Sequence, residues 1–424
     1  MRGGGRVSAT ERTPRRNASR PRAYDIVIVG GGLVGASLAL ALAGAARRVL
    51  LIEGVASDSS LQPSFDERTT ALGNASRRIF EGLGVWDHLA REAAPIRVIH
   101  ISDAGHFGGA RLRAEEQGVE AFGYVIPNRV IGAALWRALQ QAEGVTLRVP
   151  ARVTAIEIAA DGAALTVTDS DGTEEIVTAR LLVAADGAQS VVRAAAGIAA
   201  AVADYEQVAI TAAVATDRPS DGTAYERFTA SGPVAVLPLR DGGYGTVWAC
   251  PAAHAAQLLQ LSDAAYLAAL QGRFGWRIGR LLRAGRRASY PLKLSRAAAS
   301  VGTRTVLVGN AAQGLHPVAG QGFNLGLRDA ALLAEHIVAA GGDPGSPELL
   351  DGYCRARAAD RSGVVRFTDS LVRLFASRVP GVSVLRDLGL VLFDLSPPAK
   401  RALARVSLGF GGPMPRLARG LTLT

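Results

Sequence analysis

The feature that most constrains this chain is a long apolar segment near its N-terminus that glycines interrupt. Residues 24–53 read YDIVIVGGGLVGASLALALAGAARRVLLIE. Residues 25–29 and 49–52 are apolar runs typical of buried strands. Between them lie residues 33–44, whose small and aliphatic side chains favour a helix. A strand, a turn, a helix and a second strand in this order predict a βαβ unit with a parallel sheet.

The glycines of this segment predict a dinucleotide site. Gly30, Gly32 and Gly35 have the G-x-G-x-x-G spacing. In such a turn the first glycine permits the sharp bend, the second lets a pyrophosphate approach the backbone, and the third lets the helix pack closely on the sheet. Glu53 follows the second predicted strand, where a carboxylate can accept hydrogen bonds from ribose hydroxyls.

The same segment also resembles a membrane anchor or signal peptide. Residues 26–46 contain no charged side chain and follow a basic N-terminus. Four of the five glycines in this run cluster at residues 30–35, where a spanning helix should be continuous, so we expect a glycine turn and no membrane span.

The composition favours a globular α/β enzyme. The chain has 424 residues, of which 49% are hydrophobic, and these suffice for a large core. Cys250 and Cys354 form no C-x-x-C pattern, and the six histidines offer no H-x-x-x-H pair. We therefore expect no disulfide framework and no metal site.

The net charge of +10 is concentrated at the two ends of the chain. Residues 1–22 contribute +6 and residues 395–424 contribute +5, which leaves the body of the chain near −1. A nucleic-acid groove needs a basic surface with stacking aromatics, and only 5% of the residues are aromatic, so no nucleic-acid partner is expected. The basic ends could contact an anionic membrane surface. For residues 1–22, a solvated disordered tail or a transit peptide are the alternatives.

Two further motifs narrow the class. Residues 185–193 read ADGAQSVVR and residues 309–326 read GNAAQGLHPVAGQGFNLG, each after a predicted buried strand. Together with the glycine turn, these motifs resemble the single-component flavoprotein aromatic hydroxylases, which share the para-hydroxybenzoate hydroxylase fold. The resemblance covers residues 24–339. The last motif is most similar to the ubiquinone-biosynthesis branch, and within it to the 2-polyprenyl-6-methoxyphenol hydroxylases.

The resemblance implies an α/β fold built from a Rossmann-like FAD-binding domain, an inserted and mostly antiparallel substrate-binding sheet, and a helical C-terminal region. Alternating patterns over residues 205–250 agree with such a sheet, and residues 265–286 and 348–395 read as helical, the latter divided near Pro380. The predicted division is a tail over 1–22, FAD-binding parts over 23–100, 126–200 and 299–342, substrate-binding parts over 101–125 and 201–298, and C-terminal helices over 343–424.

The resemblance also assigns cofactor roles. Gly30, Gly32 and Gly35 would hold the FAD pyrophosphate and Glu53 the ribose. Further FAD contacts would come from Arg68, Arg129, Asp186, Asn310, Gly320, Gln321, Gly322, Phe323 and Asn324. Arg68 and Arg129 could instead be surface arginines, and Asp186 could simply cap a helix. Asn128 is itself expected to cap a helix over residues 130–141.

Asn310 departs from the wider class, which usually carries Gly-Asp where this chain has Gly-Asn. An asparagine keeps an acceptor oxygen, so it can still bind a flavin hydroxyl with one negative charge fewer. The backbone N–H groups at residues 320–324, at the start of a helix, would stabilise negative charge on reduced flavin. His316, Pro317 and Gly322 are the candidate residues at the reacting edge of the flavin, although His316 could be structural.

The implied reaction hydroxylates an electron-rich phenol with dioxygen through a flavin C4a-hydroperoxide. NADPH or NADH would act as a transient co-substrate, since no second G-x-G-x-x-G turn follows a strand. Phe228, Leu237 and Trp248 are expected to wall a dry substrate pocket, or alternatively to form plain sheet core. The sequence offers no convincing general base.

Three functions remain open at this stage. The first is hydroxylation of a polyprenylated methoxyphenol in ubiquinone biosynthesis, by a cytoplasmic protein that could bind the inner membrane peripherally. The second is hydroxylation of a soluble aromatic compound. The third is a flavin-binding subunit without catalysis in a biosynthetic complex. Other ubiquinone-biosynthesis proteins and a second copy of the chain are possible partners.

Overall fold

The computed structural model describes residues 21–56, 59, 66, 68–315, 320–376, 382–410 and 414–423. The tail expected over residues 1–22 lies almost entirely outside these ranges. Among the described residues, no helix has both the length and the apolar content that crossing a bilayer requires.

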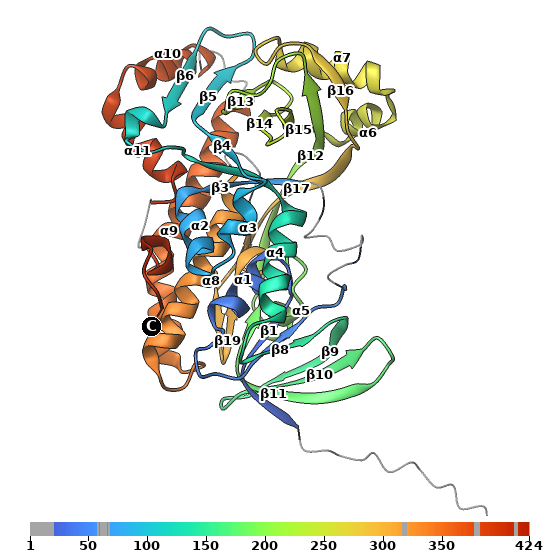
Figure 1. Ribbon diagram of the computed structural model, residues 1–424, viewed down its shortest axis with the longest axis vertical. Coiled ribbons are helices and arrows are strands. Elements are labelled where there is room, and N and C mark those ends of the chain that lie inside the picture. The colour runs from blue at the N-terminus through green and yellow to red at the C-terminus, as the bar shows by residue number, and fades with distance from the viewer. Residues whose placement is uncertain are drawn as a thin grey trace, which may run out of the picture.

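A parallel sheet forms the middle of the molecule (Figure 1). Its parallel strands lie in the order β19, β11, β1, β2 and β8. β18 and a hairpin extension of β9 and β10 complete this sheet. The bounds are β1 Arg22–Val29, β2 Val49–Ile52, β8 Val145–Arg148, β9 Ala151–Ile158, β10 Ala163–Asp169, β11 Glu174–Ala184, β18 Val301–Gly302 and β19 Thr305–Leu307.

Different elements pack on the two faces of this sheet. Ile26 and Ile28 of β1 pack with the helices, whereas Val27 and Val29 pack with the hairpin of β9 and β10. This division follows from the alternation of side chains along a strand. The helices are α1 Leu33–Ala41, α2 Asn74–Gly82, α3 Trp86–Ala90, α4 Asn128–Gln140, α8 Gln321–Ala340 and α9 Pro347–Ala376, with the short α5 Val191–Ala195 after β11.

A second, mostly antiparallel sheet lies at the upper end of Figure 1. Its order is β20, β17, β12, β15, β14, β13, β5 and β6, and β16 pairs with β12. One of its faces is covered by α6 Ala252–Gln260 and α7 Asp263–Phe274. The strands are β5 Val98–Asp103, β6 Gly109–Arg113, β12 Ala200–Thr216, β13 Thr223–Phe228, β14 Val234–Pro238, β15 Tyr244–Pro251, β16 Leu281–Ala284, β17 Ala288–Ala297 and β20 Gln313–Gly314.

A small sheet and two C-terminal helices lie next to the two large sheets. The small sheet pairs β3 Thr69–Gly73 and β4 Ala94–Ile96 with β7 Gly123–Pro127. The helices α10 Val382–Asp394 and α11 Pro397–Ser407 pack beside β6 at the upper left of Figure 1. Three short 3-10 helices, η1 Glu115–Gln117, η2 Gly309–Ala311 and η4 Leu417–Arg419, complete the described elements.

Two local predictions are wrong. The helix expected over residues 265–286 ends at Phe274, because Gly275 adopts φ +90° and the chain then continues into β16. Asn128 does not cap α4: Pro127 is the N-cap residue, and the Asn128 side chain instead accepts a hydrogen bond from the Thr70 hydroxyl at 2.6 Å. Helices α9 and α10 are two separate elements, as expected for the C-terminal region, and Pro380, where the division was expected, lies outside the described residues.

Candidate FAD and substrate site

The three sequence motifs meet at one edge of the parallel sheet. Val29, the last residue of β1, lies in register with Ile52 of β2 and with Ala184 of β11, which in turn lies opposite Leu307 of β19. Each motif begins within two residues of these positions. Ligands of open parallel sheets bind beyond these carboxyl ends, so the register brings the motifs to one site.

Glycine is required at two positions of the first turn. Gly30 has φ +103°, and a Cβ atom there would lie 2.4 Å from the carbonyl oxygen of Ala185. A Cβ atom on Gly35 would lie 1.9 Å from the carbonyl oxygen of Gly30. These contacts explain why only glycine lets the turn, β11 and α1 come together.

Glu53 holds the backbone of the same turn. One of its carboxylate oxygens accepts a hydrogen bond from the N–H of Gly31 at 2.6 Å, and the other accepts one from Val55 at 2.9 Å. The indole of Trp136 donates to the carbonyl of Gly31 at 3.2 Å. The carboxylate predicted to bind ribose therefore lies beside the turn predicted to hold the pyrophosphate.

Close packing of glycines brings the last motif against the first. A Cβ atom on Gly309 would lie 3.2 Å from the Val34 side chain, and one on Gly326 would lie 3.0 Å from the same side chain. Gly309 and Gly326 also lie against each other. Asn310 is exposed and lines the same cavity as Gly32.

Two helices point uncapped N-termini at this cavity. α1 begins after Gly32 and α8 begins after Gly320, and neither glycine has a side chain that could accept the first amide hydrogens. Gly32, Leu33, Gln321 and Gly322 all line the cavity. The dipole of a helix N-terminus attracts anions, so the two ends fit the pyrophosphate and the electron-rich flavin ring of FAD.

The cavity has a volume of about 1710 Å³ and extends from these residues to an apolar region. Its predicted cofactor residues are Gly32, Arg68, Asn310, Gly320, Gln321, Gly322, Phe323 and Asn324. Its apolar residues come from the second sheet and the C-terminal helices and include Ile99, Phe228, Leu237, Val247, Leu390, Phe393 and Leu403. One continuous space therefore joins the FAD residues to a candidate substrate pocket.

The two predicted arginines differ in position. Arg68 lines the cavity, forms an ion pair with Asp66, and has its guanidinium 5.2 Å from the centre of the Tyr290 ring. Burial raises the pKa of Tyr290 against the opposing effect of Arg68, so its hydroxyl is protonated at neutral pH. Arg129 is exposed and does not line the cavity.

Asp186 caps the short helix that follows it. One carboxylate oxygen accepts the N–H groups of Val191 at 2.8 Å and Val192 at 3.3 Å. Its neighbours Ala185 and Gly187 line the cavity, but Asp186 itself does not. Arg193, from the same motif, donates to the carbonyl of Ala311 at 3.0 Å and so ties β11 to the last motif.

The predicted substrate residues separate by the face of the sheet on which they lie. Phe228 and Leu237 line the cavity, as does Val247. Trp248, next to Val247 on β15, does not: it is only 1% exposed and packs with Tyr266 on the face covered by α6 and α7. The alternation of side chains along the strand is the physical reason for this difference.

The candidate residues at the reacting edge are only partly described. Gly322 lines the cavity, and a Cβ atom there would meet no protein atom within 4 Å. His316 and Pro317 lie outside the described residues. Tyr290 and the apolar residues of α10 and α11 were not among the predicted site residues, because no local motif in the sequence marks them.

A buried ionic network fixes α8 against α9. Asp329 of α8 is fully buried and accepts hydrogen bonds from Arg357 at 2.7 Å, Arg361 at 3.2 Å and Gln313 at 3.0 Å. Burial alone would raise the pKa of Asp329, but Arg361 and Arg357 outweigh burial and lower it. The network therefore holds the helix whose N-terminus faces the cavity.

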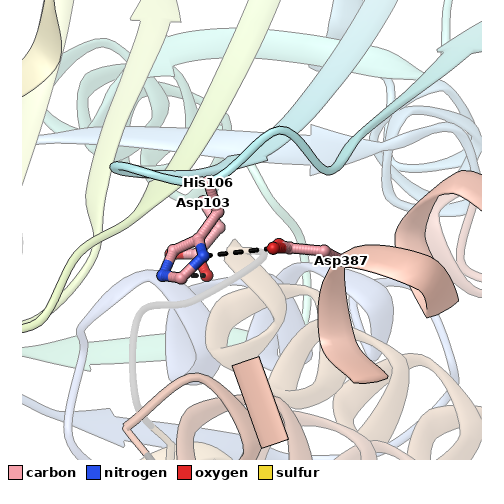
Figure 2. Close-up of side chains that lie close together, drawn as sticks. All are labelled: Asp103, His106 and Asp387. Atoms are coloured by element: carbon pink, nitrogen blue, oxygen red, sulfur yellow. Dashed lines mark hydrogen bonds and ion pairs between the residues drawn. The ribbon is translucent and has the colours of Figure 1, made fainter. Parts of the chain in front are cut away.

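A smaller polar cluster attaches α10 to the turn between β5 and β6 (Figure 2). Nδ1 of His106 lies 3.1 Å from a carboxylate oxygen of Asp387, and Nε2 lies 3.9 Å from one of Asp103. Both aspartates are buried, and the three side chains are close enough to hold a cation. Each nitrogen of the His106 ring faces one of the two carboxylates. This arrangement suits an imidazole that bridges the two aspartates, because one cation could bind only one of the two ring nitrogens.

The fold and the site together define a flavin-dependent enzyme with the aromatic-hydroxylase fold. The p-nitrophenol 4-monooxygenase PnpA of Pseudomonas putida DLL-E4 has this fold, with a TM-score of 0.76, 19% sequence identity, and coverage of 92% of this chain and 99% of that one. The anhydrotetracycline hydroxylase OxyS of Streptomyces rimosus superimposes with a TM-score of 0.68 at 26% identity, over 91% of this chain and 76% of that one.

The chain belongs to the FAD_binding_3 family, the FAD binding domain, which matches residues 23–368. It is 39% identical to ubiquinone hydroxylase UbiL of Rhodospirillum rubrum over 96% of this chain and 95% of that protein. It is 34% identical to 3-demethoxyubiquinol 3-hydroxylase of Escherichia coli over 91% of this chain and 98% of that protein. These findings confirm the predicted fold class, the FAD cofactor and the enzyme class, an FAD-dependent monooxygenase.

Proposed function

We propose that this protein hydroxylates the aromatic ring of a polyprenylated phenol in ubiquinone biosynthesis, with dioxygen and NADPH or NADH as co-substrates. The names of the relatives from Rhodospirillum rubrum and Escherichia coli support the pathway. The observation that carries the proposal is the continuous cavity of about 1710 Å³. Pockets for a single drug-sized ligand usually measure about 300–1,000 Å³, so this cavity has room for FAD together with an apolar substrate.

Bound FAD would supply the redox chemistry, taking hydride from the nicotinamide nucleotide and activating dioxygen. The residues of this chain would bind the cofactor and orient the substrate. The backbone amides after Gly32 would hold the pyrophosphate, and the N-terminus of α8 would stabilise negative charge on the ring system through its dipole. Asn310 would offer a hydroxyl-binding amide on the same cavity wall.

The apolar part of the cavity would exclude water from the reacting ring. Phe228, Leu237 and Phe393 come from three different elements and present no charge to the cavity. A dry wall suits a reactive oxygen intermediate, which water would otherwise discharge without hydroxylation. The hydroxyl of Tyr290, protonated because burial raises its pKa, is a donor that could orient a phenol oxygen.

The experiment measures coupling between nucleotide oxidation and ring hydroxylation. Purified protein loaded with FAD is given phenols with prenyl tails of increasing length under ¹⁸O₂, and the product is analysed by mass spectrometry. We expect one ¹⁸O atom in the hydroxyl group added to the ring, with the other released as water, and a KM that falls as the tail grows. Equal turnover of tailless phenols would instead favour a soluble aromatic substrate. A yellow protein that oxidises no nucleotide with any phenol would contradict the proposal and favour a flavin-binding subunit.

A further inference from the structure

We propose that α10 and α11 form a docking surface for an anionic lipid bilayer, hereafter the α10–α11 surface. It consists of the exposed side chains of Leu388, Leu392, Leu395, Arg401 and Arg405. The inference deepens the function proposed above and rests on it, because a phenol with a prenyl tail resides in lipid. The surface would bring the cavity to the place where that substrate is held.

The helix α10 is apolar on two sides. Leu388, Leu392 and Leu395 are 48%, 67% and 72% exposed, and their spacing of four and three residues places them on one face. Leu390 and Phe393, from a different face, line the cavity. A helix that only closed the cavity would need no leucines on its outer face, so the exposed stripe calls for a second apolar environment.

Two aspartates hold the helix in the orientation that keeps these leucines outward. Asp387 contacts His106, and Asp394 accepts a hydrogen bond from the N–H of Arg111 at 2.9 Å and pairs with Lys400 at 3.0 Å. The two aspartates are seven residues apart and so project from one side of α10, which is neither the leucine face nor the cavity face. Figure 2 shows the first of these attachments, with Asp387 reaching from the helix to the imidazole.

The neighbouring turn adds a further exposed apolar ring. Phe107 is 73% exposed and lies between two residues that both contact Asp387. His106 does so through its ring, and a Cβ atom on Gly108 would lie 2.8 Å from the Cα atom of Asp387. Exposed aromatic and leucine side chains on adjacent elements are typical of surfaces that insert into the headgroup region of a bilayer.

The helix α11 contributes the charge. Arg401 and Arg405 are exposed and four residues apart, so they share a face, while Leu403 and Val406 line the cavity. Residues 388–410 contain Lys400, Arg401 and Arg405 and one acid, Asp394, which is already paired with Lys400. A cationic rim beside exposed leucines complements the negative surface of an anionic membrane.

The charge also argues against a second copy of the chain as the occupant. A twofold interface pairs a surface with itself, so it would place Arg401 and Arg405 near those of the partner, while Asp394 is already paired with Lys400. An anionic bilayer meets no such repulsion. A helix is about 10–12 Å thick, so a docked α10 would leave the cavity wall within about one helix diameter of the lipid.

The test is flotation of the full chain, loaded with FAD, with vesicles of phosphatidylglycerol and phosphatidylethanolamine at low salt. We expect the wild type to float with these vesicles and not with vesicles of phosphatidylcholine alone. The variant Leu388→Ser/Leu392→Ser/Leu395→Ser should lose about tenfold or more in vesicle partitioning, and Arg401→Gln/Arg405→Gln should lose the preference for anionic lipid. All variants keep residues 1–22, so differences report on the α10–α11 surface.

The matched control is Leu282→Ser/Arg283→Gln/Arg286→Gln, which removes an exposed leucine and two exposed arginines near β16. It should float like the wild type. Equal flotation of the leucine variant would overturn the proposal, and so would a wild type that does not float. A leucine variant that changes from dimer to monomer by light scattering, with flotation intact, would assign the surface to a second copy.

A separate assay keeps this result distinguishable from the proposed function. Hydroxylation of a tailless phenol in detergent-free buffer requires no membrane, so the leucine variant should keep its FAD content and its kcat on that substrate. If neither the wild type nor any variant hydroxylates a phenol, the proposed function fails while the flotation result still decides the docking surface. A drop in FAD content in the leucine variant would show that its fold is damaged, and Leu392→Ser alone would then be compared.

Discussion

The side-chain oxygen of Asn324 accepts a hydrogen bond from the backbone N–H of Gly73 at 2.9 Å, across 251 positions of sequence. The same oxygen accepts the Ser76 hydroxyl at 2.6 Å. The side-chain nitrogen donates to the carbonyls of Ala71 and Gly320, each at 2.8 Å. One buried amide therefore fixes the first turn of α8 against β3 and α2, and so positions the N-terminus that faces the cavity.

This amide should not tolerate a carboxylate of the same shape. Asn324→Asp would replace the donating nitrogen with an oxygen that faces two carbonyls, so we expect the free energy of unfolding to fall by roughly 3 kcal/mol. FAD affinity should fall as well, because the start of α8 would move. Urea denaturation and flavin titration measure the two effects. Asn310→Asp, at an exposed position, should change stability by less than about 0.5 kcal/mol. Equal effects of the two variants would contradict this role of Asn324.

The open space at Gly322 offers a test of where the flavin lies. A Cβ atom at this position would meet no protein atom within 4 Å, and valine has a slightly better helix propensity than glycine, so Gly322→Val should change the free energy of unfolding by less than about 0.5 kcal/mol. The same side chain would project at the cavity, so FAD affinity should fall by about tenfold or more. Flavin titration measures the effect on FAD affinity, and thermal unfolding of the apoprotein measures the effect on stability. Gly272→Val, at a helical glycine away from the cavity, should leave FAD affinity unchanged. Normal FAD affinity in Gly322→Val would place the ring elsewhere.

Removal of the buried charge of Asp329 should be costly. Asp329→Asn removes the buried carboxylate that Arg357 and Arg361 share and leaves Asp360 as the acidic partner of Arg357, so we expect a loss of about 3–5 kcal/mol at pH 7. Because the folded-state pKa of Asp329 is lowered, its contribution is present above its unfolded pKa and disappears as the pH falls below about 4. Stability measured against pH should therefore be flatter in the variant at acid pH. Asp263→Asn, in an exposed pair, should lie within about 0.5 kcal/mol of the wild type.

His100 should make the protein sensitive to mild acid. Burial, and after it the nearby charge of Arg111, lower the pKa of His100 to about 4. An unfolded histidine titrates near 6.5, so stability should be complete above that pH and decline between about 6.5 and 4, with a limiting slope of about 1.4 kcal/mol per pH unit. His100→Gln should remove this part of the slope in urea midpoints, whereas the exposed control His88→Gln should keep it. An unchanged slope in His100→Gln would show that other groups cause the decline.

The sequence predicts the cofactor side of the site well because its requirements are local. Gly30 and Gly35 are glycines for steric reasons that act within one turn, and apolar runs such as residues 181–184 announce buried strands. Each motif follows the end of such a strand. Parallel pairing then brings the ends together, so three local patterns suffice to locate one site.

The substrate side depends on relationships that no short segment contains. Whether Val247 or Trp248 faces the cavity depends on which face of β15 the helices α6 and α7 cover, and the period of the strand cannot tell its two faces apart. The network of Asp329 and Arg357 joins two helices whose pairing appears only in three dimensions. The sequence offers two roles for Asp186, and its carboxylate accepts hydrogen bonds from the amides of Val191 and Val192, as a helix cap would, while its cofactor role stays a prediction.

The contribution of α10 and α11 to the cavity has a consequence for biogenesis. The β1–α1 unit is synthesised first, whereas Leu403 and Val406, which line the apolar part, are added nearly four hundred residues later. During translation the glycine turn of the nucleotide site is therefore made long before the apolar part of the cavity can be enclosed. A ribosome-bound intermediate would expose the apolar residues of the incomplete cavity to chaperones. The packing of α10 and α11 onto the cavity would be among the last steps of folding.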